Sequence, residues 1–298
     1  MATSVRQAQA TPKDRDGDWR NLEGRAREVA EDATVLAEGA QGIASGPNQR
    51  PADLGAQDST AKLPMAVILS GGRGTRLQEH TRWIPKPLVE IGGRPIVWHV
   101  IQIYLAQGFQ RFLLLTGYKS KLVDAFVDHE PWPDGVEVCC LDTGEDTPTG
   151  GRLAKAASSI ADDTFCVTYA DGVADIDLEA LLACHAAHDA LATMTVVQPE
   201  LQFGVAVMSG DGVISRFVEK PRCEQWINGG FFCFDRSVFD FLDEDDVLER
   251  EPLERLAAAG QLRAFRHEGF WDCMDTYKDA VLLGDLWGRG RAPWKVWA

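Results

Sequence analysis

A glycine-rich loop directly after an apolar stretch is the part of the sequence with the clearest chemical potential. The stretch 65–69 reads Met-Ala-Val-Ile-Leu, and the loop 70–77 follows it. Three glycines lie in this loop, at Gly71, Gly72 and Gly74. The backbone N–H groups of such a loop can surround a phosphate chain, and Arg76 adds positive charge. Glycines after a strand can also serve only the geometry of the turn, so both explanations stay open.

The loop does not match the two common phosphate-binding motifs. It lacks the Gly-Lys-Ser/Thr ending of a Walker A motif, and Leu77 stands where a dinucleotide fingerprint has its third glycine. A lysine between two prolines, Pro85-Lys86-Pro87, follows shortly afterwards. Because proline rings restrict the backbone, this frame limits where the ammonium of Lys86 can point. The loop and this lysine together predict a cationic pocket for phosphate groups.

These residues resemble a known family. Leu-Ser-Gly-Gly-x-Gly-Thr-Arg-Leu at 69–77, followed by Pro-Lys-Pro, is similar to the signature of the sugar-phosphate nucleotidyltransferases, the NDP-sugar pyrophosphorylases. Further blocks resemble one subfamily, the glucose-1-phosphate cytidylyltransferases, in order: residues 89–99, 141–144, 149–153, 171–175, 227–232, 269–276 and 292–295. The resemblance runs from residue 65 to the C-terminus. It implies an enzyme that transfers a nucleotidyl group from CTP to a sugar 1-phosphate and releases pyrophosphate. Glucose 1-phosphate is the sugar phosphate expected first among the candidates.

The resemblance implies a set of residues around the nucleotide. Arg76, Lys86 and Asp171 would be catalytic. The nucleotide would also contact Leu69, Gly71, Gly72, Gly74, Thr75, Thr147, Gly151, Arg152 and Ala170. Arg152 could donate hydrogen bonds to acceptor atoms of cytosine, or it could be a surface counter-ion in an acidic protein. CTP is therefore the expected donor, with GTP, UTP, ATP and dTTP as alternatives.

A magnesium site is the expected cofactor site. Asp171 follows an apolar stretch, at the end of a strand where α/β sheets present ligand groups, although a lone aspartate there is often a cap or turn residue. The resemblance pairs it with Asp275. Mg²⁺ prefers hard oxygen ligands and keeps waters and substrate phosphates, so two carboxylates suffice.

The sugar phosphate would lie against a different group of residues. The resemblance places it on Glu219, Lys220, Asn228 and Gly229. An amide can hydrogen-bond a sugar hydroxyl, and glycine allows the backbone to approach the ring. A Glu-Lys pair on a surface strand can also be merely solvated.

Three departures from the subfamily stand out. The stretch between residues 127 and 137 is shorter than usual, Ala170 replaces the usual glycine before the metal-binding aspartate, and the first 62 residues have no recognised counterpart. Ala170 and the shortened stretch motivate a second hypothesis, the same reaction with another nucleotide or a modified sugar phosphate. A third reading is a non-catalytic nucleotide or sugar sensor.

The order of apolar and helical stretches predicts the elements that position these residues. Strands are expected at 65–69, 112–116, 136–141, 165–169, 192–197 and 227–234, and helices at 95–107, 120–127 and 178–188. This alternation favours an α/β, Rossmann-like fold with a mixed, mainly parallel sheet. After residue 198 the pattern becomes antiparallel, with a hairpin of 205–208 and 213–219. That smaller part carries the predicted sugar-binding residues.

Composition divides the chain into two parts and limits the partners. Residues 1–62 form a polar extension with one marginal helix expected at 19–38, and residues 63–298 form the catalytic domain. The 298 residues carry 30 Lys and Arg against 45 Asp and Glu, a net charge of -15, which argues against binding to nucleic acid or an anionic membrane.

The sequence also predicts where and in what form the protein works. No membrane span or signal peptide is expected, which favours the cytoplasm. The seven cysteines form no C-x-x-C pair, so reduced and mostly buried thiols are expected. His185 and His188 have helical spacing that could hold a metal, but no third ligand is evident. The resemblance implies a homo-oligomer.

Overall fold

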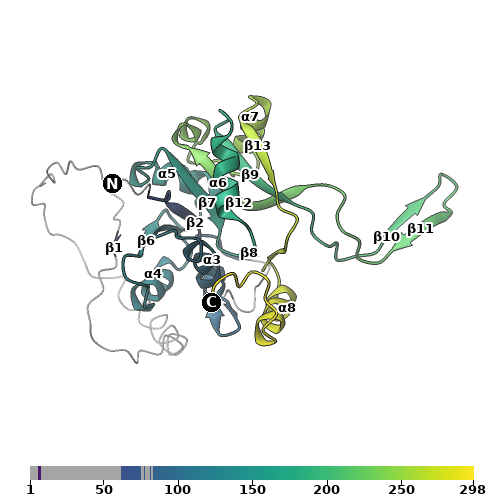
Figure 1. Cartoon of the computed structure of the whole chain (residues 1–298), viewed down its shortest axis with the longest axis horizontal. Coiled ribbons are helices and arrows are strands. Elements are labelled where there is room, and N and C mark those ends of the chain that lie inside the picture. Colours follow the sequence, from purple (N-terminus) through teal and green to yellow (C-terminus); the bar gives the residue numbers. More distant parts are fainter. Residues whose placement is uncertain (1–5, 8–61, 75–76, 78–80, 82) are drawn as a thin grey trace, which may run out of the picture.

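A mixed sheet of eight strands forms the centre of the molecule. The computed structural model describes residues 6–7, 62–74, 77, 81 and 83–298 (Figure 1). Within these residues the strand order is β1-β6-β5-β2-β7-β12-β9-β13. The strands are β1 (Arg6–Gln7), β6 (Glu137–Asp142), β5 (Arg111–Thr116), β2 (Ala66–Leu69), β7 (Thr164–Tyr169), β12 (Ile227–Asp235), β9 (Ala192–Val197) and β13 (Leu262–Arg266).

The direction of these strands confirms the predicted fold class. Strands β6, β5, β2 and β7 run parallel to one another, and β13 runs parallel to β9, whereas β1 is antiparallel to β6. Strand β12 is antiparallel to both β7 and β9. The sheet is therefore mixed and mainly parallel, as the alternation of apolar and helical stretches predicts.

The central strand β2 is buried on both faces. Ala66 and Ile68 face one apolar core, whereas Val67 and Leu69 face a second one on the opposite side of the sheet. Successive residues of a strand point to opposite faces, so a strand covered on both sides must be apolar throughout. This explains the uninterrupted apolar stretch in the sequence.

Helices cover both faces of the sheet. Helices α3 (Ile96–Leu105), α4 (Ser120–His129), α6 (Leu178–Ala186) and α8 (Tyr277–Gly288) contribute side chains to the core of Ile68. Helices α5 (Thr149–Ala156) and α7 (Glu251–Ala258) contribute to the core of Val67. The sequence predicted α3, α4 and α6 within a few residues, whereas α5, α7, α8 and β13 were not anticipated.

Short elements complete the body. They are η3 (Lys86–Leu88), β3 (Glu90–Ile91), β4 (Arg94–Pro95), η4 (Ala157–Ser159), β8 (Gly172–Ala174), η5 (Arg236–Phe241) and β14 (Trp271–Cys273). Strand β14 pairs antiparallel with β8, which brings the segment before Asp275 next to the segment after Asp171.

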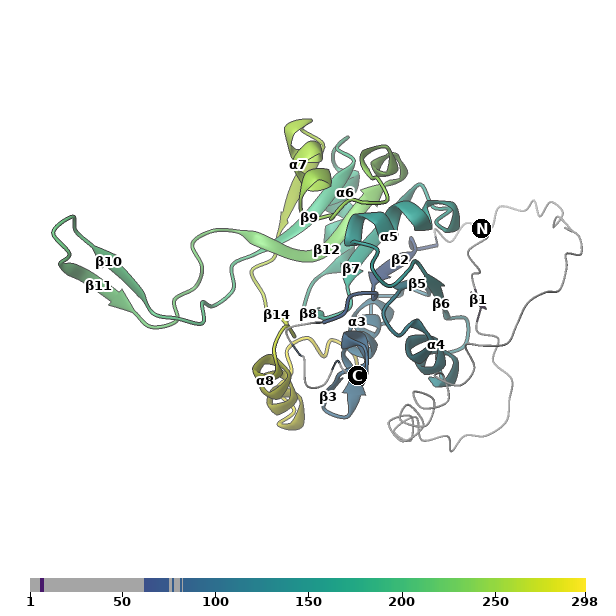
Figure 2. The ribbon, with the colours of Figure 1, turned by 180° about the vertical axis from the view of Figure 1, so that it is seen from behind.

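A two-stranded ribbon projects far from the body. Strands β10 (Val205–Met208) and β11 (Ile214–Val218) pair antiparallel, as the sequence predicts. Figures 1 and 2 show this hairpin extended away from the sheet, joined to it by two chain segments that leave β9 and enter β12. We call residues 198–226, between β9 and β12, the arm.

Several expectations concern parts outside this core. The helix expected at 19–38 lies outside the described residues. Strand β1, within the N-terminal extension, pairs with β6 at one edge of the sheet. No helix in the described part of the chain is long and apolar enough to cross a membrane. The cytoplasmic location stays a prediction.

The cysteines are free thiols, as expected, but fewer of them are buried than expected. Cys140, Cys166 and Cys233 are buried, and the other four are only half-buried. Burial raises the pKa of Cys140 above the usual range, with the nearby carboxylates of Asp124 and Asp128 acting in the same direction. A thiol held in its neutral form is a poor nucleophile, so this cysteine serves the packing.

Candidate active site

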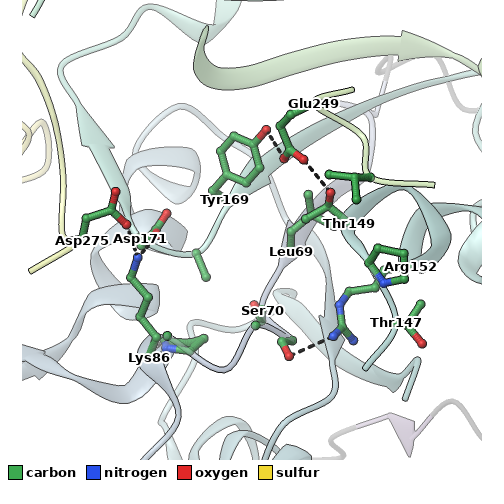
Figure 3. Close-up of a pocket in the computed structure, with 17 residues that line it drawn as sticks. Leu69, Ser70, Lys86, Thr147, Thr149, Arg152, Tyr169, Asp171, Glu249 and Asp275 are labelled. Carbon is green, nitrogen blue, oxygen red and sulfur yellow. Dashed lines mark hydrogen bonds and ion pairs between the residues drawn. The ribbon is translucent and has the colours of Figure 1, made fainter. Parts of the chain in front are cut away.

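The largest group of predicted residues surrounds one cavity at the carboxyl ends of β2 and β7. Its volume is about 480 Å³. Figure 3 shows its lining, which consists of Leu69, Ser70, Gly71, Gly72, Gly74, Lys86, Pro87, Thr147, Pro148, Thr149, Arg152, Tyr169, Ala170, Asp171, Val247, Glu249 and Asp275. The ends of parallel strands are where α/β sheets bind ligands. Ten residues predicted to contact the nucleotide or the metal are thus together in one place.

The glycine-rich loop is fixed to the sheet at its start. The N–H of Ser70 donates to the carbonyl of Leu115 at 2.9 Å, and the N–H of Tyr118 donates to that of Gly71 at 3.1 Å. Gly74 has a φ of +60°, and a Cβ there would lie 2.8 Å from the Cβ of Lys86. Glycine is therefore required at this turn for conformation and for space. Thr75 and Arg76 lie outside the described residues, so their predicted roles stay predictions.

A lysine and two aspartates meet at one side of the cavity. The Nζ atom of Lys86, in η3, lies 2.5 Å from Oδ2 of Asp171 and 2.6 Å from Oδ1 of Asp275. Burial lowers the pKa of Lys86, but the two carboxylates outweigh it and raise the pKa above its ordinary value. Lys86 is therefore a permanent cation at neutral pH. Three segments far apart in the sequence supply this cluster, which Figure 3 shows at the edge of the cavity.

The same two carboxylates suit a magnesium ion. Both approach a single cation, the lysine ammonium, so they lie close enough to share another one. Their oxygens are hard donors, as Mg²⁺ requires, and two of them suffice where phosphates and waters complete the coordination. No group of three or more His, Cys, Asp or Glu side chains that could hold a metal occurs among the described residues, which include His185 and His188.

Arg152, at the other side of the cavity, is a buried structural cation. Only 3% of its surface is exposed, so its interpretation as a surface counter-ion is wrong. Its Nη1 donates to the carbonyls of Thr116 and Gly144, at 2.8 Å each, and to Oγ1 of Thr143 at 2.6 Å. Its Nη2 donates to the carbonyls of Gly71 and Glu145. The guanidinium thus joins the glycine-rich loop to the ends of β5 and β6, and its predicted contact with the base stays a prediction.

Burial has a direct electrostatic effect on Arg152. It lowers the pKa of the guanidinium from its ordinary value, while Asp142 and Asp146 act in the opposite direction. An arginine keeps its charge at all ordinary pH values even so. The cavity therefore has a cationic side chain at each side, Lys86 and Arg152, of which Lys86 is paired with two carboxylates.

The remaining predicted nucleotide residues form the wall beside Arg152. Thr147 lines the cavity, and its Oγ1 donates to the carbonyl of Thr143 at 2.6 Å and accepts from Nζ of Lys155 at 3.0 Å. Gly151, in α5, lies behind the wall, where a Cβ would overlap the carbonyl of Glu244. Ala170 lines the cavity, is 4% exposed and also belongs to the core of Ile68.

A chain of hydrogen bonds that sequence reasoning missed crosses the cavity wall. The hydroxyl of Tyr169 donates to Oε1 of Glu249 at 2.6 Å, and Thr149 donates to Oε2 of the same carboxylate at 2.7 Å. Nδ2 of Asn228 donates to the Tyr169 hydroxyl at 3.1 Å. Burial, and then the Glu249 charge, raises the pKa of Tyr169 well above its ordinary value, so the hydroxyl keeps its proton. The acidic segment around Glu249 carries no motif that would have revealed it.

The predicted sugar-phosphate residues are divided by the structure. Asn228 reaches the cavity wall through Tyr169, and the carbonyl of Gly229 accepts a hydrogen bond from Nε1 of Trp271 at 2.7 Å. Glu219 and Lys220 are exposed, lie on the arm and do not line this cavity. Lys220 instead lines a separate hollow of about 540 Å³. These four residues therefore do not share the lining of this cavity, and their predicted contact with the sugar phosphate stays a prediction.

Comparison with known proteins gives a consistent result. Residues 65–272 match the family described as Nucleotidyl transferase. The chain is 42% identical over 259 residues to the glucose-1-phosphate cytidylyltransferase of Salmonella typhi, covering 78% of this chain and 99% of that protein. It is also 42% identical over 254 residues to a probable glucose-1-phosphate cytidylyltransferase of Bacillus subtilis (strain 168), with the same two coverages of 78% and 99%.

Solved structures give the same fold. The crystal structure of HddC from Yersinia pseudotuberculosis superposes with a TM-score of 0.60 at 24% identity, covering 76% of this chain and 100% of HddC.

Proposed function

The chain belongs to the nucleotidyl transferase family, and we propose that it transfers the cytidylyl group of CTP to glucose 1-phosphate, giving CDP-glucose and pyrophosphate. The relatives that are 42% identical over most of the chain carry the name of this reaction. Their names support a sugar phosphate as the acceptor, and the choice of CTP as the donor is part of this proposal.

One observation carries the proposal: Lys86, Asp171 and Asp275 converge at the edge of a glycine-lined cavity. Joining a triphosphate to a sugar phosphate brings two polyanions together, and charge develops at the attacked phosphorus. A site for this reaction needs fixed cations, backbone N–H groups and oxygen ligands for a metal. The glycines of the loop, Lys86 and the two aspartates support the proposal because groups of these kinds line one cavity at the carboxyl ends of β2 and β7.

The residues of the chain would act mainly by binding and positioning. The backbone of the glycine-rich loop would hold the triphosphate, and Lys86 would move from the carboxylates to the α-phosphate. The sugar phosphate oxygen would then attack in line, and pyrophosphate would leave from the opposite side. Asp171 and Asp275 would hold Mg²⁺, which would supply positive charge against the charge of the substrates.

The choice of CTP rests on the wall beside Arg152. Thr147 and Arg152 line the cavity at the side away from Lys86, where the base of a triphosphate bound at the glycine loop would lie. Arg152 uses both terminal nitrogens on the protein itself. The loop carbonyls that it fixes would therefore shape the base pocket together with any contact that it makes directly. Ala170 motivates the alternative, the same reaction with GTP, UTP, ATP or dTTP.

The test is pyrophosphate release with Mg²⁺ and glucose 1-phosphate, measured with each of the five triphosphates separately. We expect release with CTP and little with the others. Release with another nucleotide alone would keep the reaction and overturn the base assignment. Tight binding of CTP without product, for every sugar phosphate supplied, would favour a sensor instead of an enzyme.

A further inference from the structure

Helix α8 begins directly after Asp275, and its first turn is closed by two side chains. Thr276 is the N-cap of the helix, and its Oγ1 accepts a hydrogen bond from the N–H of Asp279 at 3.3 Å. In return, Oδ2 of Asp279 accepts from the N–H of Thr276 at 2.7 Å and from its hydroxyl at 2.8 Å. This reciprocal pattern is a capping box. It fixes the start of α8 next to the cluster of Lys86 and the two aspartates.

The Asp279 carboxylate reaches one residue further than a capping box requires. The same Oδ2 atom also accepts from the N–H of Asp275 at 3.1 Å, although Asp275 precedes the cap. That N–H is shared with the carbonyl of Cys273, at 3.2 Å. Asp279 is only 6% exposed, and hydrogen bonds to a charged group are strong where water is excluded. One buried oxygen thus ties the backbone of Asp275 to the helix.

The residue before Asp275 is tied to the segment of the other aspartate. The N–H of Met274 donates to the carbonyl of Asp171 at 2.9 Å, and the side chain of Met274 is fully buried. The antiparallel pairing of β14 with β8 continues this connection. The backbone of Asp275 therefore has a fixed point on each side, Met274 before it and the contacts of Asp279 after it.

The far end of α8 is anchored beside the segment that carries Lys86. A Cβ at Gly92, which has a φ of +61°, would overlap the ring of Trp287, so this helix and the turn after β3 are in close contact (Figure 2). Strand β3 follows η3, which contains Lys86. A helix anchored at both ends cannot shift along its axis without breaking contacts. Helix α8 therefore holds Asp275 at a set place relative to Lys86, whose Nζ lies 2.6 Å from Oδ1 of Asp275.

We propose that Asp279 is a positioning residue, which fixes Asp275 where it meets Lys86 and would meet the metal. This inference rests on the proposed function. Asp279 does not line the cavity, so it acts through Asp275 and not by contact with a substrate. Residues one contact behind a metal ligand orient that ligand, and their loss typically costs about ten- to hundredfold in metal affinity or activity.

Two substitutions separate the hydrogen bonds of Asp279 from its charge. Asp279→Ala removes the acceptor, and we expect the Mg²⁺ concentration for half-maximal pyrophosphate release to rise about tenfold. Asp279→Asn keeps an oxygen that can accept the same hydrogen bonds, so it should restore most of the wild-type response. An effect of D279N as large as that of D279A would overturn the proposal, because the charge would then matter and the contact with the backbone would not.

The matched control removes a helix cap elsewhere. Asp177 is the N-cap of α6, and its side chain accepts from the N–H of Ala180 at 2.8 Å. We expect Asp177→Ala and D279A to lower the unfolding temperature by a similar few degrees, since each weakens one helix start. Only D279A should raise the Mg²⁺ requirement. An equal rise in D177A would overturn the proposal, because a general loss of stability would then explain both results.

Coupling between the two residues gives a further criterion. If Asp279 acts through Asp275, D279A should cause no additional loss of rate in a chain that already carries Asp275→Ala. The residual pyrophosphate release of the single and double variants measures this. Losses that multiply would overturn the proposal, because the two aspartates would then act independently.

A measurement without turnover separates this inference from the proposed function. In hydrogen exchange on the ligand-free protein, the Thr276 amide should be protected in the wild type and in D279N, and should exchange about tenfold faster in D279A. Unchanged exchange at Thr276 in D279A would overturn the inference. A wild type that forms no product with any triphosphate, but shows the expected exchange, would overturn the function and leave the positioning of Asp275 in place.

Discussion

Two cations line the same cavity, and the protein holds them in different ways. Lys86 contacts two carboxylates, each partly exposed, from segments that meet only in the folded chain. Arg152 is buried and donates to four backbone carbonyls and one hydroxyl. The Lys86 side has anionic partners, which the phosphate of a bound substrate would be able to replace. The Arg152 side has neutral partners that belong to the framework.

This contrast distinguishes a residue that can take part in the reaction from a residue that maintains the structure of the site. An ammonium between two carboxylates can exchange one anionic partner for another at low cost. A guanidinium that satisfies five acceptors cannot leave without exposing them, since unsatisfied buried acceptors are costly. We therefore expect changes at Lys86 to affect turnover and changes at Arg152 to affect stability first.

Replacement of Lys86 should give the largest effect. We expect Lys86→Ala to lower kcat/KM about a hundredfold, or about 3 kcal/mol, because one contact to the developing charge in a shielded site is lost. The unfolding transition should stay close to that of the wild type. Pyrophosphate release and thermal unfolding measure the two effects. Lys86→Arg keeps the charge but not the point contact and should recover little; a loss of less than tenfold in kcat/KM for K86A would contradict the role of Lys86 in turnover.

Replacement of Arg152 should act mainly on folding. Arg152→Ala leaves buried carbonyls without a donor, and we expect about 3 kcal/mol less free energy of unfolding in urea. Arg152→Lys should recover only part, because a lysine has no planar fork. The control is Arg73→Ala, which removes an arginine that pairs with Glu145 and Asp146 at the surface and should change little. Unchanged stability in R152A would contradict the framework role.

Two adjacent glycines sharpen the same comparison without removing a charge. A Cβ at Gly71 would overlap the guanidinium of Arg152, whereas a Cβ at Gly72 would meet nothing within 4 Å. We expect Gly71→Ala to lower the free energy of unfolding by about 2 kcal/mol, as overpacking typically does. Gly72→Ala should leave it nearly unchanged. If the two variants unfolded alike in urea, the position of Arg152 would not depend on close packing with the loop.

The smallest effect is expected at the wall between the two cations. Tyr169→Phe removes the hydroxyl that joins Asn228 to Glu249 and should cost about 1 kcal/mol of stability. Because the hydroxyl positions Asn228, the KM for the sugar phosphate should rise a few-fold while the KM for the nucleotide stays unchanged. Steady-state kinetics with each substrate varied in turn would show this. An equal rise in both KM values would contradict a specific effect on the sugar phosphate and would mean that the Tyr169 hydroxyl supports the cavity as a whole.

The sequence predicted elements where local pattern and final environment agree. Strand β2 and helices α3, α4 and α6 were predicted because their apolar spacing matches the faces that they bury. Helix α5 was not predicted, because its Gly150 and Gly151 are poor helix formers. A Cβ at Gly150 would lie 2.8 Å from the carbonyl oxygen of Asp246, and one at Gly151 would lie 1.9 Å from that of Glu244, so glycine is needed there for packing. The residues that impose this requirement are more than ninety positions away in the chain.

The glycine-rich loop, Lys86 and the two aspartates can be recognised in the sequence alone, and so can the family that they indicate. These groups stand in short local motifs, so no tertiary contact is needed to recognise them. The roles of other residues follow only from the folded structure. It shows that Arg152 is buried against backbone carbonyls and that Glu249 lines the cavity. It also shows that Glu219 and Lys220 do not line it. Such roles depend on which distant backbone faces a side chain, and the pairing of strands and the direction of the arm set that relation.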